Sequence, residues 1–269
     1  LRHVSDAFIE DPLRVFRVCR FTATLDFNIY PDTLKLMVRL VNTGELSTLS
    51  TERVWNEILK GLMGKKPSLM IDSLTKCGAL EAINSSLSNG VYDEKNKTFI
   101  YTALDLAATN TLSIETRVAI FCLLTEHDVK KVIEQHSARI TARKNVSRDL
   151  LAQLRATKSQ NQTSMLFLGY LGSILNANEL SNEQIVDLVM CLDGLRNPDR
   201  FKKILDAAST VGQALIKQNY TDHIRILMRS LNILKSIRHD DLTKIDSTAE
   251  INQRVRYARI NALDTELSR

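Results

Sequence analysis

The fold is best indicated by one segment near the start of the chain, Glu10-Asp11-Pro12-Leu13-Arg14-Val15-Phe16-Arg17-Val18-Cys19-Arg20-Phe21. Asp11 is a good helix cap because its carboxylate can accept hydrogen bonds from free backbone N–H groups. Pro12 suits the first helical position, where its missing N–H costs nothing. Arg14, Arg17 and Arg20 then recur at every third position among apolar side chains, so they share one side of a helix. The segment therefore predicts a well-capped helix that begins at Pro12.

The side chains of Asp11 and Arg14 lie three residues apart and have opposite hydrogen-bonding properties. An ionised Asp only accepts hydrogen bonds and an Arg only donates them. Together they would complement the edge of cytosine or adenine, in which an exocyclic amine stands beside a ring nitrogen that accepts. Uracil and guanine show the reverse order. A purely structural interpretation stays open here, because a cap, a helix-starting Pro and an i,i+3 ion pair need no ligand.

A family resemblance adds to this interpretation. Residues 1–27 resemble the segment that follows the catalytic head in bacterial CCA-adding tRNA nucleotidyltransferases, which belong to class II of the poly(A) polymerase/CCA-adding superfamily. In that family a Glu-Asp-x-x-Arg motif is the protein template for CTP and ATP, and here it reads Glu10-Asp11-Pro12-Leu13-Arg14. A second family feature, Glu-Arg-x-x-x-Glu, appears as Glu52-Arg53-Val54-Trp55-Asn56-Glu57. The resemblance is close up to about residue 80 and faint afterwards.

The resemblance implies roles for the residues of the first motif. Asp11 would accept from the exocyclic amine of cytosine or adenine, and Arg14 would donate to the adjacent ring nitrogen. Arg17 would add a contact to the base or a phosphate, and Glu10 would orient the motif.

Glu52 and Arg53 lie in the first turn of a predicted helix, and we expect them to support the template helix rather than to act in catalysis. The family resemblance makes them a brace for the template helix. The residues alone suggest only that Glu52 favours the helix dipole and that Arg53 pairs with a nearby carboxylate.

Composition points to an ordinary helical globular protein. The chain has 269 residues, 44% hydrophobic and 25% charged, with few Gly (9) and Pro (4), so helical periodicity dominates. The net charge of +5 permits a polyanionic partner. Four isolated cysteines suggest a reduced, cytoplasmic protein, and no apolar run is long enough for a membrane span. The chain begins with Leu inside a motif-bearing segment, as an excised piece would.

The order of predicted elements divides the chain into two helical regions. Residues 1–83 form a neck and body region, 84–97 a Ser/Asn/Gly-rich linker, and 98–269 a helical body and tail. In the second region we expect helices near 98–109, 113–125, 147–157 and 162–175. Later helices begin at a capping box at Ser181, at Asn197-Pro198, near Asp222 and at a second capping box over 247–250. The result is an all-α fold, with neck, body and tail in an elongated arrangement.

Many relatives carry a metal-dependent phosphohydrolase site in the second region, marked by a His-Asp pair after an apolar helix. Here Leu123-Leu124 stands where that pair would fall, and His127-Asp128 follows a few residues later without the other expected histidines. We therefore predict no metal and no phosphohydrolase activity in this region.

Basic residues gather in two groups, one after residue 138 and one near the C-terminal end. A solvated helix face is the simpler interpretation of such groups. In a tRNA-handling protein they would instead contact backbone phosphates. The candidates for tRNA contact are Arg143, Lys144, Arg254, Arg256 and Arg259.

Several chemical groups needed for nucleotidyl transfer are missing from the sequence. It has no Gly-rich phosphate loop and no Asp-x-Asp pair ahead of the template. In the resembling family, those carboxylates bind Mg²⁺ and lie in a head domain that would precede Leu1. We therefore expect the nucleotide-selecting and tRNA-binding part of a CCA-adding enzyme, inactive by itself, with ATP and CTP as substrates. Part of a bacterial poly(A) polymerase and a non-catalytic helical RNA-binding module remain alternatives, and the oligomeric state stays open.

Overall fold

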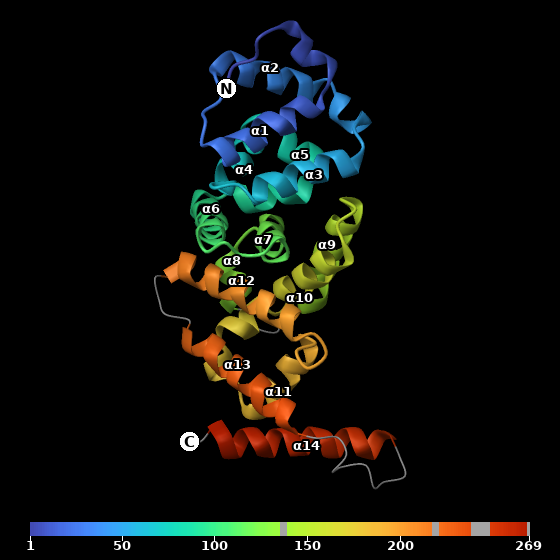
Figure 1. Cartoon of the computed structure of the whole chain (residues 1–269), viewed down its shortest axis with the longest axis vertical. Helices are drawn as coiled ribbons and strands as arrows, with labels where there is room; N and C mark the ends of the chain where they lie inside the picture. Colours follow the sequence, from blue (N-terminus) through green and yellow to red (C-terminus); the bar gives the residue numbers. More distant parts are fainter. Residues whose placement is uncertain (135–138, 217–220, 238–247, 268–269) are drawn as a thin grey trace.

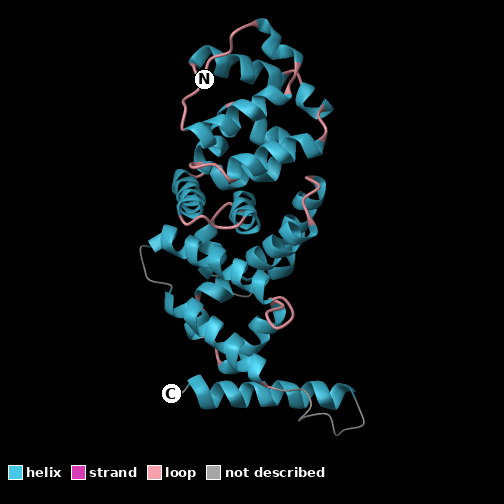
Figure 2. Ribbon diagram, viewed as in Figure 1, coloured by secondary structure: helices cyan, strands magenta, loops and turns pink. Residues whose placement is uncertain are grey.

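The computed structural model describes residues 1–134, 139–216, 221–237 and 248–267, and every regular element among them is helical (Figures 1 and 2). The helices stack into an elongated molecule, with α1 and α2 towards one end of the long axis and α14 at the other. The predicted all-α, elongated fold is confirmed. The α-helices are α1 (Leu13–Leu25), α2 (Pro31–Asn42), α3 (Thr51–Leu62), α4 (Pro67–Lys76), α5 (Ala79–Ile83), α6 (Glu94–Thr109), α7 (Ile114–Phe121), α8 (Val129–Glu134), α9 (Ile140–Gln153), α10 (Lys158–Leu175), α11 (Asn182–Cys191), α12 (Pro198–Ile216), α13 (Thr221–Ser236) and α14 (Thr248–Leu267). Short 3₁₀ helices connect them: η1 (Asp6–Glu10), η2 (Glu45–Thr48), η3 (Ser85–Val91), η4 (Cys122–Thr125) and η5 (Ala177–Glu179).

The first helical group is built around α1, which packs against α3 and α4. Its inner face carries Val15, Phe16, Cys19 and Ala23, all buried. Removing a large apolar side chain from water stabilises a fold by roughly 1.5–3 kcal/mol. Helix α1 is therefore a rigid base for the residues at its start.

A buried arginine connects this group to the next one. Arg117 on α7 is 4% exposed. Its Nη1 donates to the carbonyl of Leu62 at 2.8 Å, and its Nε donates to the carbonyl of Leu112 at 2.9 Å. Leu62 is the last residue of α3, where carbonyls lack partners within the helix. Arg117 thus joins α7 to the end of α3, and burial lowers its pKa.

Residues 84–97 differ from the irregular linker that the sequence predicts. They form η3 and the first turn of α6, and Leu87 is fully buried. The Asn96 side chain donates to the carbonyls of Gly90 at 3.1 Å and Glu126 at 3.0 Å. The segment is ordered because its Asn side chains satisfy backbone groups of tight turns. Whether residues 84–97 also separate two domains stays a prediction.

The helices expected near 147–157 and 162–175 are present with other bounds, as α9 and α10. Helix α9 spans Ile140–Gln153, so the predicted bounds were wrong at both ends. The end of α9 carries no glycine signal, because Arg155 occupies the left-handed position with φ +54°. Helix α10 starts at Lys158 behind a capping box formed by Thr157 and Gln160, which is its signal in the sequence.

Helices α11, α13 and α14 form the end of the molecule opposite α1 (Figure 1). The predicted capping box at Ser181 is confirmed, since its side chain accepts from the N–H of Gln184. The second predicted capping box begins at residue 247, outside the described residues. Among the described helices, none has the length and apolarity that crossing a membrane requires.

Candidate functional site

Asp11 lies between η1 and α1, where its carboxylate has a partner on each oxygen. Oδ1 accepts from the backbone N–H of Leu13 at 3.1 Å, and Oδ2 lies 3.5 Å from Nη2 of Arg53. The Asp11 backbone is extended and Pro12 has helical dihedral angles. Asp11 thus supplies the predicted acceptor at the helix start, while α1 itself begins at Leu13, one residue later than predicted. The side chain stays 33% exposed. A carboxylate offers about four acceptor positions, so both oxygens can still accept from a ligand.

Arg14 stands one turn further along α1, on the same side as Asp11. Its Nη1 donates to the carbonyl of Ala7 in η1, which ties the lead-in segment to the helix. The guanidinium is half-buried and retains other N–H groups for a ligand. Arg17 and Glu10 are both exposed. Asp11, Arg14 and Arg17 thus follow one another at intervals of three residues along the start of α1.

The Glu-Arg-x-x-x-Glu segment at the start of α3 contacts this site through Arg53, whereas Glu52 turns away. The Glu52 carboxylate pairs with Nη1 of Arg155 at 3.1 Å, in the turn between α9 and α10. Of the two residues predicted to have a supporting role, Arg53 contacts Asp11 and Glu52 contacts Arg155.

Glu57, the last residue of that segment, contacts α1 and was not among the predicted supporting residues. It is 7% exposed, and its Oε2 lies 2.6 Å from Nε of Arg20 on α1. This partly buried pair joins α3 to α1, and Glu57 also pairs with Lys60 at 3.3 Å. Its signal in the sequence was a carboxylate on the apolar face of α3, between Val54 and Ile58.

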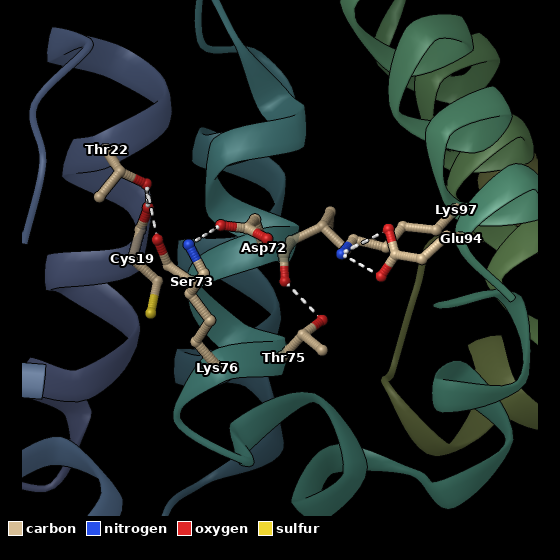
Figure 3. A network of polar contacts seen from close by, with 9 residues as sticks. Cys19, Thr22, Asp72, Ser73, Thr75, Lys76, Glu94 and Lys97 are labelled. Atoms are coloured by element: carbon tan, nitrogen blue, oxygen red, sulfur yellow. Dashed lines mark hydrogen bonds and ion pairs between the residues drawn. The ribbon is translucent and has the colours of Figure 1, made fainter. Parts of the chain in front are cut away.

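The rest of α1 is fixed by contacts with α4 (Figure 3). Thr22 donates to the carbonyl of Cys19 at 2.7 Å, and its oxygen lies 3.3 Å from Oγ of Ser73. Cys19 is fully buried, and this burial raises the pKa of its thiol. The cysteine therefore serves as a small packing residue beneath the site.

Two of the basic candidates, Arg143 and Lys144, lie on α9. Arg143 is 6% exposed, and its Nε lies 3.9 Å from Glu126. Its guanidinium faces a carboxylate and is largely buried, at the edge of a pocket that Lys131 and Arg139 also line, so a tRNA contact by Arg143 stays a prediction. Lys144 is half-buried, with its ammonium 5.2 Å from the ring centre of Tyr170.

The other basic candidates lie on α14 and differ in exposure. Nη2 of Arg256 pairs with Glu183 at 2.6 Å and Asp187 at 2.9 Å on α11. Arg259 directs Nη1 towards the sulfur of Met190 at 3.3 Å, and burial lowers its pKa. Arg254 is exposed. The contacts of Arg256 and Arg259 hold α14 on α11, which leaves Arg254 as the candidate best placed to meet a polyanion.

No group of three or more His, Cys, Asp or Glu side chains in the described part of the chain is arranged to bind a metal ion. At the His-Asp dipeptide, His127 is exposed and Asp128 pairs with Lys131 at 3.6 Å.

Known proteins match the chain along nearly its whole length. The multifunctional CCA protein of Dechloromonas aromatica (strain RCB) is 33% identical over 283 residues, covering 98% of this chain and 68% of that protein. This chain belongs to the multifunctional CCA protein family. A second CCA protein, from Paraburkholderia phymatum, is 32% identical over 287 residues, covering 99% of this chain and 68% of its own length. Residues 26–89 of this CCA family member also match a family model described as "Probable RNA and SrmB- binding site of polymerase A".

Solved structures share the fold of this CCA family member. A CCA-adding enzyme in complex with CTP has a TM-score of 0.62 at 14% identity, covering 98% of this chain and 58% of that chain. The Thermotoga maritima CCA-adding enzyme complexed with tRNA has a TM-score of 0.59 at 14% identity, with 96% and 58% coverage. The chain thus spans somewhat more than half of each solved structure, and at this identity the likeness establishes the fold.

Proposed function

We propose that this chain selects CTP and ATP and binds tRNA within an enzyme that adds CCA to tRNA 3′ ends. The observation that carries the proposal is the Asp11 carboxylate, held by Leu13 and Arg53 beside Arg14. Its relatives support it: they include multifunctional CCA proteins and CCA-adding enzymes solved with CTP and with ATP.

Nucleotide choice follows from the order of acceptor and donor at the start of α1. The exocyclic amine of cytosine or adenine donates to Asp11, and its neighbouring ring nitrogen accepts from Arg14. Uracil and guanine would face Asp11 with an acceptor and Arg14 with a donor. A site built on such hydrogen bonds rejects wrong partners strongly, because its polar groups are then left unpaired.

The contacts already made by these side chains prepare them for a base. The bond from Arg14 to the Ala7 carbonyl and the contacts on Asp11 restrict both side chains before a nucleotide arrives. Less side-chain freedom is then lost on binding. Arg17, exposed one turn further, adds a contact to the base or a phosphate, and Glu10 orients the motif.

Transfer of the nucleotide needs groups that the described residues do not supply. Nucleotidyl transfer uses carboxylates that hold two metal ions at the reacting oxygens. In this proposal Mg²⁺ is bound by another part of the enzyme, and this chain alone binds nucleotide without joining it to RNA. Exposed Arg254 is our first candidate for a tRNA phosphate contact. The unpaired cysteines fit a reducing compartment, so we place the protein in the cytoplasm.

The test measures nucleotide choice in the full-length enzyme with tRNA ending before CCA. Asp11→Asn and Arg14→Gln should each reduce the preference for CTP and ATP over UTP and GTP by roughly 10- to 100-fold, the range expected for a two-bond base contact. Asp32→Asn is the matched control, because Asp32 is an exposed carboxylate in the first turn of α2. Unchanged choice in both Asp11→Asn and Arg14→Gln would show that the template assignment is wrong.

The matched family model names polymerase A, so a poly(A)-adding enzyme is the second candidate. A primer comparison separates the two: the CCA-adding enzyme extends tRNA that ends before CCA, and a poly(A) polymerase also extends unstructured RNA. A non-catalytic RNA-binding module would bind tRNA and show no difference between CTP and UTP in equilibrium binding.

A further inference from the structure

The turn between α9 and α10 has an unusual backbone for its sequence. Arg155 adopts a left-handed conformation with φ +54°. Its N–H donates to the carbonyl of Ala152 at 3.0 Å, and the N–H of Ala156 donates to that of Leu151 at 2.9 Å. This is the Schellman pattern of helix ends, in which glycine usually takes the left-handed position. An arginine is held there against its backbone preference.

Side chains of the same turn contact two elements of the first helical group, α3 and α5. Nη1 of Arg155 lies 3.1 Å from Oε1 of Glu52, in the first turn of α3. The Gln153 side chain donates to the carbonyl of Ile83 at 3.2 Å and accepts from Nδ2 of Asn84 at 2.7 Å. The turn therefore contacts the start of α3 and the end of α5 at once.

The turn also lies beside helix α1. Leu154 lines a small cavity of about 170 Å³ together with Phe16 of α1 and Thr51 and Val54 of α3. A displacement of the turn would therefore change the packing next to α1 as well as the start of α3.

Glu52 stands next to Arg53, which contacts Asp11. At 3.5 Å the contact from Arg53 to Asp11 is at the outer limit of a hydrogen bond. A Glu52 carboxylate without a partner would compete with Asp11 for the Arg53 guanidinium. The pair with Arg155 gives the Glu52 carboxylate another partner.

We propose that Arg155 is a positioning residue for nucleotide choice: through Glu52 it holds the first turn of α3, so that Arg53 keeps Asp11 in its orientation. The proposal rests on the function proposed above for Asp11. It links nucleotide choice to the position of the turn between α9 and α10, nearly 150 residues further along the chain. Arg155 itself contacts no nucleotide in this scheme.

The expected effect is moderate because the pair is exposed. The side chains of Arg155 and Glu52 are 67% and 64% exposed. Pairs of this kind shift an equilibrium by about 2- to 5-fold. Arg155→Asn should reduce the preference for CTP and ATP over UTP and GTP within this range, and Asn tolerates the left-handed conformation. Arg155→Glu places two carboxylates together and should reduce this preference further.

Two variants separate the proposed role from a general charge effect. Lys158→Glu changes the charge as Arg155→Glu does, but at an exposed residue in the first turn of α10. It should leave nucleotide choice unchanged. The double variant Glu52→Arg with Arg155→Glu reverses the pair and should restore the choice lost in Arg155→Glu alone. A merely structural role for the turn would not give this rescue.

The first readout needs no nucleotide. In the 269-residue chain, hydrogen exchange at the amides of Arg53 and Val54, which donate to the Ser50 carbonyl at 3.0 and 3.2 Å, should accelerate about 2- to 5-fold in Arg155→Asn. The reversed pair should bring exchange back to the original rate. Unchanged exchange in both Arg155 variants would overturn the proposal.

The second readout is nucleotide choice in the full-length enzyme, with Asp11→Asn measured in parallel. If Asp11→Asn has no effect on choice, the proposed function has failed, and the exchange data alone decide whether Arg155 holds α3. If Asp11→Asn reduces choice but Arg155→Glu does not, the proposed function stands and the role of Arg155 is refuted.

Discussion

At the scale of single residues, the start of α1 shows a capping carboxylate that still has room to accept further hydrogen bonds. Asp11 caps α1 through Leu13 and is contacted by Arg53. Each oxygen has only one internal partner in these contacts, so the carboxylate can still accept from a base. The structural and the recognition interpretations of Asp11 are therefore compatible.

Arg117 allows a direct test of how a single buried charge supports this arrangement. Replacing it with Ala removes the donors to the carbonyls of Leu62 and Leu112 and leaves a cavity. Each buried group without a partner costs about 1–3 kcal/mol, so we expect a loss of about 3 kcal/mol or more in the free energy of unfolding. Denaturant titration followed by circular dichroism measures this loss. Arg200→Ala is the control, because its partially exposed pair with Asp193 should contribute about 1 kcal/mol or less; equal losses in both variants would contradict the prediction.

At the scale of elements, the seating of α1 depends on close backbone contact with the turn after α3. A Cβ added at Gly64 would lie 2.8 Å from the carbonyl oxygen of Ala23 on α1. The N–H of Lys66 donates to the same oxygen at 3.0 Å. Backbone atoms move less easily than the end of a side chain, so this contact leaves no room for a methyl group.

Gly64→Ala should therefore destabilise the protein by about 1–3 kcal/mol, as overpacking usually does. Thermal or denaturant unfolding measures the change. Gly44→Asn is the control, since Gly44 has φ +78° and nothing within 4 Å of an added Cβ, and Asn tolerates that conformation. A larger loss in the control than in Gly64→Ala would show that close packing is not the reason.

Helix existence could be read from the sequence more reliably than helix bounds. The ends marked by side chains that cap backbone groups were found, at Asp11 and at Ser181. The end of α9 was misplaced because a left-handed Arg155 carries no sequence signal. The same left-handed conformation occurs at Thr111 and Asp193, which are not glycines either.

At the scale of the whole molecule, the segment 84–97 joins its neighbours more firmly than a linker would. Leu87 is fully buried, and Nδ2 of Asn89 donates to the Thr125 carbonyl at 3.1 Å. A second contact joins the helices before this segment to those after it: Trp55 of α3 packs against Phe121 of α7, with ring centres 6.1 Å apart.

Limited proteolysis tests this junction. A protease of broad specificity should cut the folded chain between residues 84 and 93 no sooner than in other described loops, because local unfolding of η3 would expose buried side chains. Mass spectrometry of the first fragments identifies the cleavage sites. Leu87→Ala is the matched variant and should make this segment an early site. Early cleavage between residues 84 and 93 in the unaltered protein would instead support a flexible linker.

The sequence by itself determined the all-α class, the capped start of α1 and the spacing that puts Asp11 and Arg14 one turn apart there. These features depend on neighbouring residues, whose helix signals and spacing are visible in a linear pattern. Only the tertiary structure decided that Arg53 contacts Asp11 while Glu52 contacts Arg155, that Glu57 is the buried brace, and that Arg143 lies in the interior. The reason is physical: burial and pairing of a charge depend on the residues that folding brings beside it from distant parts of the chain.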